Sequence, residues 1–150
     1  MTTGSIVSIE ANRELIRRYY DEVLNGGDLE LLDELAAPDY VENDPFPDQR
    51  TGRVGLKDRV TILRTAFTQR WTLEDVVAGG NKVAARWTST GTHTGDFMGI
   101  AATGRAFTIA GVDFYRITDL KMAEHWHVVD MLGLMQQLGL LPNFQEEAAT

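Results

Sequence analysis

The chain has 150 residues, of which 43% are hydrophobic and 24% charged, a composition typical of one folded globular domain. Its net charge of −8 and its pI of about 4.8 argue against a nucleic-acid or anionic-membrane surface, because the scattered Lys and Arg residues form no basic patch. The lack of cysteine excludes disulfides, thiolate chemistry and cysteine-ligated metals.

The N-terminal residues lack the basic and apolar regions of a signal peptide, and no apolar run is long enough to span a membrane. We therefore expect a cytoplasmic protein with neither membrane nor nucleic-acid partners. No repeat or linker divides the chain. The prediction is a single domain over residues 1–150, with an ordered core at about 10–142 and loose tails on either side.

The first half of the chain has helical periodicity. Apolar residues recur at helical spacing over residues 11–24, and Asn25-Gly26-Gly27 ends that pattern. Asp28 is a candidate N-cap for a short helix that ends at Pro38. After a Pro- and Asp-rich loop, residues 55–69 predict a third helix with Leu56, Val60, Leu63 and Phe67 on one face.

The second half predicts strands. Residues 71–78, 82–92, 106–118 and 121–129 are rich in β-branched and aromatic residues, and residues 130–140 return to helical spacing. Helices followed by an antiparallel sheet indicate the α+β class. A curved sheet over helices would enclose a cavity, which is a common ligand site.

The turn between the last two predicted strands decides which side chains face that cavity. With a three-residue turn, Asp113 shares a face with His125 and His127. With a two-residue turn, Asp113 shares the face of Trp126 instead. The sequence favours neither turn, because Leu120 is poorly suited to the positive φ that either one prefers.

The Asp113 face has two interpretations. It is either ordinary sheet surface, for example at a subunit contact, or the wall of a reactive cavity. In the second case Asp113 accepts a hydrogen bond from His127, which fixes the imidazole tautomer and raises its basicity. Such a histidine could remove a proton next to a carbonyl and return it to an alkoxide.

Two further sites compete with this pair. Asp130 is a rival base, although its position favours a role as N-cap of the last helix. His93, His125 and His127 could supply three imidazoles to a zinc ion. Because nothing in the sequence holds His93 near the other two, we expect no metal.

The chain resembles the SnoaL-like polyketide cyclase (ester cyclase) family over about 130 positions. The matching segments are "RELIRRYYDEVLNGGDLELLDELAAPDYVENDP", "GTHTGDFMGI" with a following "TG", "GVDFYRITDLK" and "EHWHVVDMLGLMQQLG". This resemblance implies the cone-shaped α+β barrel of nuclear transport factor and ketosteroid isomerase, with a hydrophobic cavity between sheet and helices. It also implies a homodimer or homotetramer formed through the sheet, and ring closure by intramolecular aldol reaction without metal or cofactor.

The resemblance also implies site residues, with one departure. The family's acid/base aspartate falls on the position of His127, and its nearby histidine falls on that of Asp113, so the two partners have exchanged strands. The alignment places Tyr19, Val23 and the Glu42-Asn43 region along the cavity. It also favours the turn that directs Asp113 inward.

The predicted function is a cofactor-independent acid/base enzyme, most consistent with an aldol-type cyclase acting on a small hydrophobic carbonyl compound. His127 is the predicted proton shuttle and Asp113 the residue that orients it. A non-catalytic binding protein, and a hydrolase or isomerase with the same pair, are the alternatives. The loop from Thr94 to Gly104 is expected to cover the cavity mouth. The predicted substrate contacts are Tyr19, Val23, Asn43, His93, Phe97, Met98, Tyr115 and His125.

Overall fold

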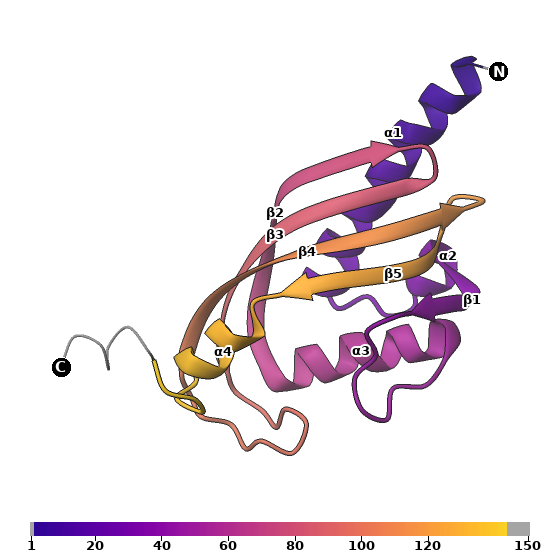
Figure 1. Ribbon diagram of the computed structural model, residues 1–150. Coiled ribbons are helices and arrows are strands. Elements are labelled where there is room, and N and C mark those ends of the chain that lie inside the picture. Colours follow the sequence, from indigo (N-terminus) through magenta and orange to yellow (C-terminus); the bar gives the residue numbers. More distant parts are fainter. Residues whose placement is uncertain (1, 144–150) are drawn as a thin grey trace.

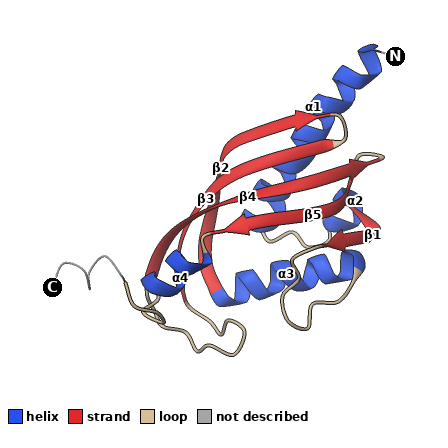
Figure 2. Cartoon of the chain, viewed as in Figure 1, coloured by secondary structure: helices blue, strands red, loops and turns tan. Residues whose placement is uncertain are grey.

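The structure is a computed structural model that describes residues 2–143. Most helices lie in the first half and most strands in the second, which confirms the α+β class (Figures 1 and 2). In chain order the elements are α1 (Thr2–Arg18), η1 (Tyr19–Asn25), α2 (Leu32–Leu35), β1 (Ala36–Glu42), α3 (Gly52–Ala66), β2 (Phe67–Gly79), β3 (Lys82–His93), β4 (Ala106–Thr118), β5 (Lys121–Val129) and α4 (Met131–Gln137).

The strands form one five-stranded sheet in the order β1-β5-β4-β3-β2. Only the edge strand β1 runs parallel to its neighbour, and it contains Pro38, which an edge position tolerates because one side of the strand needs no donor. The other neighbouring strands pair antiparallel. Figure 1 shows the sheet bending strongly around α3 and the end of the first helix, which lie on its concave side.

The first helix matches its prediction and extends beyond it. It begins at Thr2, so the N-terminal segment expected to be a loose tail is helical. Its last turns, η1, are π-helical and bury Tyr19, Tyr20, Val23 and Leu24 together. This wider turn presents two adjacent tyrosines to the sheet.

The second and third helices depart from their predicted ranges, the second because it is shorter and the third because it begins and ends three residues earlier. The second helix is only the single turn Leu32–Leu35, and β1 begins directly after it. The third ends at Ala66, so Phe67, expected on its apolar face, is the first residue of β2. Phe67 remains buried in the core, because the strand directs it to the same interior as the helix face.

The β4–β5 hairpin combines features of both predicted turns. Asp119 and Leu120 have φ of 51° and 59° and form a two-residue turn, with Thr118 opposite Lys121. A bulge then adds one residue, Ala123, to β5 and shifts the register. From Arg116 onward the pairing is that of the three-residue turn, so Asp113 lies opposite His127 and both face inward.

The convex face of the sheet exposes apolar side chains. Phe114 and Trp126 stack edge to face there, and Val112, Val128 and Val77 are exposed nearby. Association through this face stays a prediction. No helix among the described residues is long and apolar enough to cross a membrane.

Candidate active site

A partly open pocket lies between the concave face of the sheet and the helices. The empty space between the protein atoms of this pocket is about 720 Å³, and part of it is continuous with solvent. Most of its wall is aromatic or aliphatic, and its ionisable groups gather on β4, β5 and α3. The lining residues are Tyr19, Leu24, Phe46, Arg59, Leu63, Phe67, Gln69, Trp71, Trp87, Phe97, Phe107, Ile109, Asp113, Tyr115, His125, His127, Val129, Met131 and Leu134.

Among the described residues that line the pocket, Asp113, at the middle of β4, is the only carboxylate. Its Oδ2 accepts hydrogen bonds from the Tyr20 hydroxyl and, at 2.8 Å, from the indole N–H of Trp87. Its Oδ1 accepts one from Nε2 of His125 at 2.9 Å. Burial raises the pKa of Asp113, but the hydrogen bonds and charge of His125 outweigh burial and lower the pKa below its usual value. The carboxyl group is therefore ionised at neutral pH.

His125 bridges two carboxylates. Its Nδ1 donates to Glu42 of β1 at 2.8 Å, and its Nε2 donates to Asp113. Burial lowers the pKa of His125, but the two carboxylates raise it to about 9. His125 is thus an imidazolium at neutral pH, with both ring N–H groups used.

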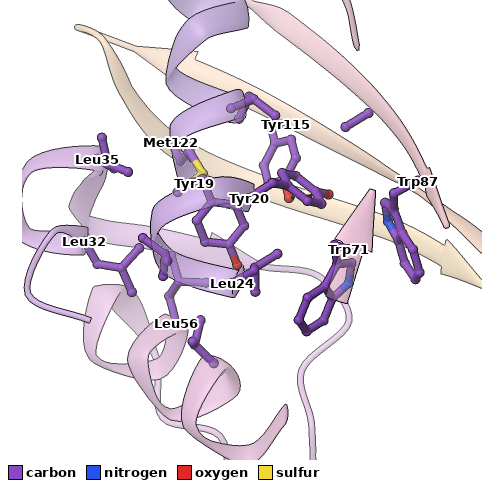
Figure 3. Close-up of a cluster of buried hydrophobic side chains, with 14 of the residues drawn as sticks. Tyr19, Tyr20, Leu24, Leu32, Leu35, Leu56, Trp71, Trp87, Tyr115 and Met122 are labelled. Atoms are coloured by element: carbon purple, nitrogen blue, oxygen red, sulfur yellow. Dashed lines mark hydrogen bonds between the residues drawn. The ribbon is translucent and has the colours of Figure 1, made fainter. Parts of the chain in front are cut away.

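The tyrosines beside this array stay protonated. Burial raises the pKa of Tyr19, Tyr20 and Tyr115, and the negative charge of Asp113 raises each of them further. Figure 3 shows Tyr20 and Tyr115 close together, with Trp87 farther along the sheet, and the two phenol oxygens are 3.2 Å apart. The three phenols can donate hydrogen bonds but cannot accept a proton as bases at neutral pH.

His127 has a different partner. Its Nδ1 lies 2.9 Å from Nη2 of Arg59, a buried arginine of α3. Its backbone N–H donates to the Asp44 carboxylate at 3.0 Å. Burial and the positive charges of Arg59 and His125 lower the pKa of His127, so the imidazole is neutral at pH 7.

The predicted hydrogen bond between Asp113 and His127 is therefore replaced by two others. Asp113 bonds diagonally to His125, one inward position along β5, and His127 bonds to Arg59. Diagonal neighbours on one face of a sheet lie within reach of long side chains, and both oxygens of the Asp113 carboxylate accept hydrogen bonds from residues other than His127. His127 and Asp113 share the pocket wall without contacting each other through a hydrogen bond.

The predicted substrate contacts fall into two groups. Tyr19, Phe97, Tyr115 and His125 line the pocket. The remaining four lie outside the lining in the described part of the chain: Val23 is core, Met98 is exposed, Asn43 donates to the His125 backbone carbonyl, and His93 is buried with its Nδ1 against Thr103.

Arg59, Tyr20 and Trp87 contact the ionisable groups and were not predicted as site residues. The sequence could have indicated Arg59, because this residue falls between Leu56 and Val60 on the apolar face of α3. A charged residue on such a face needs a buried partner. The contact of Trp87 with Asp113 had no sequence signal, because it depends on the register between β3 and β4.

Gly111 makes room for Trp87. A Cβ atom at Gly111 would lie 2.4 Å from Cζ2 of the indole ring. We expect Gly111→Ala to push the indole off Asp113 and to lower the free energy of unfolding by about 1–3 kcal/mol, the usual effect of overpacking. Urea denaturation measures this change. Gly79→Ala is the control, since its Cβ would meet nothing within 4 Å, and equal stability of the two variants would contradict the prediction.

Asp130 is the N-cap of α4. Its carboxylate accepts from the Gly133 N–H at 2.9 Å, and it is not among the described residues that line the pocket. We expect Asp130→Ala to lower the free energy of unfolding by about 1 kcal/mol and to leave turnover unchanged. Asp130→Ser, which keeps a capping oxygen, should retain most of the stability. Lost turnover at unchanged stability would instead make Asp130 catalytic.

Glu42, His125 and His127 each place a potential ligand atom within 4.8 Å of the others. The Arg59 guanidinium already serves this cluster as a cation, 3.7 Å from Glu42 and bonded to Nδ1 of His127. Both nitrogens of His125 also donate to carboxylates. A metal needs free lone pairs on its ligands, and most of those in this cluster already take part in hydrogen bonds or ion pairs. The cluster of Glu42, His125 and His127 is therefore better described as an internal ion-pair network than as a metal centre.

Known proteins share this architecture. Residues 14–138 match the family model of the SnoaL-like polyketide cyclases. The chain is 32% identical to the aklanonic acid methyl ester cyclase DauD of Streptomyces sp. (strain C5) over 133 residues, 84% of this chain and 80% of that protein. It is 30% identical to the nogalonic acid methyl ester cyclase of Streptomyces nogalater over 118 residues, 77% of this chain and 88% of the relative.

A solved structure agrees with these sequence matches. TsrD from Streptomyces laurentii superposes with a TM-score of 0.79 at 32% identity, covering 88% of this chain and 97% of TsrD. The match of the family model extends from the first helix to the end of α4 and so includes every element of the pocket. The chain belongs to the SnoaL-like polyketide cyclase family.

Proposed function

We propose that this chain is a cofactor-independent acid/base enzyme that closes a ring in a hydrophobic polyketide by intramolecular aldol reaction. The observation that carries the proposal is an ionised carboxylate, Asp113, on the wall of an otherwise largely apolar pocket. The similarity to two proteins named as methyl ester cyclases supports the same class of reaction.

An aldol ring closure needs two groups on the protein. One accepts a proton from a carbon next to a carbonyl, and the other polarises the carbonyl that the new carbanion attacks. Asp113 and His127 occupy directly opposed positions on β4 and β5 and both line the pocket. We propose that these two residues divide the tasks, while the aromatic wall excludes water from the reactive enolate.

The experiment is incubation with a panel of polyketide methyl esters and β-keto esters, followed by mass spectrometry. The proposal predicts a cyclic product with the mass of the substrate, or that mass less one water. A product heavier by one water would replace the cyclase by a hydrolase. Tight binding without conversion across the panel would replace it by a binding protein.

A further inference from the structure

The contact between Arg59 and His127 defines where the imidazole carries its proton. A guanidinium can only donate hydrogen bonds, so Nδ1 of His127, 2.9 Å from Nη2, must accept. A neutral imidazole that accepts at Nδ1 carries its hydrogen on Nε2. Among the described residues none bonds to this Nε2, and His127 lines the pocket.

We propose that Arg59 is a positioning residue that holds His127 in the neutral, Nε2-protonated tautomer, so that His127 donates a hydrogen bond to the substrate's acceptor carbonyl and Asp113 accepts the carbon-bound proton. The inference rests on the proposed function and assigns its two tasks to particular residues. It replaces the expected proton shuttle at His127 by a fixed donor.

Arg59 is held firmly enough for this role. Its Nη1 donates to the Asp44 backbone carbonyl at 2.9 Å, and its guanidinium carbon lies 4.2 Å from the centre of the Phe46 ring. The residue is 7% exposed and starts from the middle of α3. The guanidinium is therefore fixed by its attachment to α3, by the hydrogen bond to the Asp44 carbonyl and by the Phe46 ring against its face.

The charges around His127 oppose its protonation. Arg59 of α3 and His125 of β5 are cations that face it, whereas Asp113 of β4 and Asp44 of the loop after β1 are anions. Glu42 of β1 is paired with His125 and Arg59. A proton on Nδ1 would also point at the Arg59 N–H groups, so geometry and charge favour the same neutral form.

Asp113 is the remaining proton acceptor among the described residues that line the pocket. His125 donates from both nitrogens, and the lining tyrosines keep their protons. A carboxylate offers about four acceptor positions. The three donors Tyr20, Trp87 and His125 leave a position of Asp113 free for the substrate.

The reaction balances with these two groups alone. The C–H bond breaks, its proton passes to Asp113 and its electron pair forms the enolate. The enolate carbon attacks the carbonyl carbon, and the carbonyl π electrons move to its oxygen, which accepts the hydrogen bond from Nε2–H of His127. Asp113 then returns its proton to the alkoxide. The product is an isomer of the substrate, and both residues regain their starting states.

Two substitutions at His127 separate a donor from a base. His127→Gln places an amide N–H near the former Nε2 but supplies no basic nitrogen, whereas His127→Ala supplies neither. We expect kcat to fall about tenfold or less in His127→Gln and about 10²–10³-fold in His127→Ala, the usual cost of losing one oxyanion donor. Equal, large losses in both variants would overturn the assignment.

Nitrogen-15 NMR of the imidazoles tests the tautomer without any substrate. The chain has three histidines, so the His127 signals can be assigned by single substitutions. We expect the hydrogen on Nε2 in the wild type, and a raised pKa of His127 in Arg59→Met, where the nearest cation and the donor to Nδ1 are lost. Arg59→Lys, which keeps a cationic donor, should restore the lower pKa in part. Arg86→Met, at an exposed pair with Asp75, is the control.

A hydrogen on Nδ1 in the wild type, or an unchanged pKa in a folded Arg59→Met variant, would contradict the inference. If Arg59→Met does not fold, the wild-type spectrum and the two His127 variants still decide the matter. Failure of the proposed function looks different, since the panel of carbonyl compounds would then give no cyclised product while the Nε2 tautomer persisted.

Discussion

We expect the replacement of Asp113 by Asn to lower kcat for cyclisation by about 10²–10⁴, the usual contribution of general acid–base catalysis. The amide has nearly the shape of the carboxyl group but cannot take up the carbon-bound proton. Its oxygen can still accept from Tyr20 and Trp87, which reach the same carboxylate oxygen of the wild type. Steady-state kinetics on a substrate found in the panel measure the effect.

Glu42→Gln is the matched control for this variant. It removes the other carboxylate that holds His125 and leaves Asp113 ionised. Both substitutions should lower the pKa of His125, because each removes an anion bonded to the ring. Only Asp113→Asn should abolish proton removal from carbon. A kcat within about tenfold of the wild type in Asp113→Asn, or an equal loss in both variants, would contradict the assignment.

The second large effect is a loss of stability in mildly alkaline solution. The pKa of His125 is about 9 in the folded chain against an ordinary value of 6.5. The stabilisation from its protonation is therefore fully present below about pH 6.5 and is lost as pH rises through about 9. At 1.36 kcal/mol per unit, this shift is worth about 3 kcal/mol of unfolding free energy.

In acidic solution the stability changes with pH in the opposite direction, rising as the pH rises. The pKa values of Asp113 and Glu42 are lowered, so their contribution is present above the unfolded values near pH 4 and is lost as pH falls below them. Urea unfolding at a series of pH values should show that the free energy of unfolding is highest between about pH 4 and pH 9. His125→Gln should remove the alkaline decline. A wild-type stability that stays flat from about pH 6.5 to 10 would contradict the charge state derived for His125.

Sequence periodicity predicted the four antiparallel strands β2–β5 and the alternation of β5 because both depend on local patterns. It did not predict β1, which begins at Ala36, inside the predicted second helix. It did not decide the inward face, because that depends on the turn and the bulge together. The two-residue turn at Asp119 and Leu120 alone would have turned Asp113 outward. The extra residue Ala123 shifts the register by one position and so turns Asp113 inward again. A small apolar residue such as alanine does not indicate a bulge in the sequence.

The pairing of ionisable groups was predicted wrongly for a related reason. With a three-residue turn, the sequence predicts Asp113 on one face with His125 and His127, and the structure has this arrangement with Asp113 opposite His127. Their hydrogen bonds, however, are decided by partners from distant elements: Tyr20 of η1, Trp87 of β3 and Arg59 of α3. Only Arg59 could have been suspected from its position on an apolar helix face.

The most direct test of acid/base chemistry at Asp113 is the exchange of a carbon-bound hydrogen. A panel substrate deuterated at the carbon next to its carbonyl can be incubated in ordinary water, and the loss of deuterium followed by mass spectrometry. We expect rapid loss of deuterium with the wild type and a rate lower by about 10² or more with Asp113→Asn. Equal rates of loss with the two proteins would show that Asp113 is not the proton acceptor.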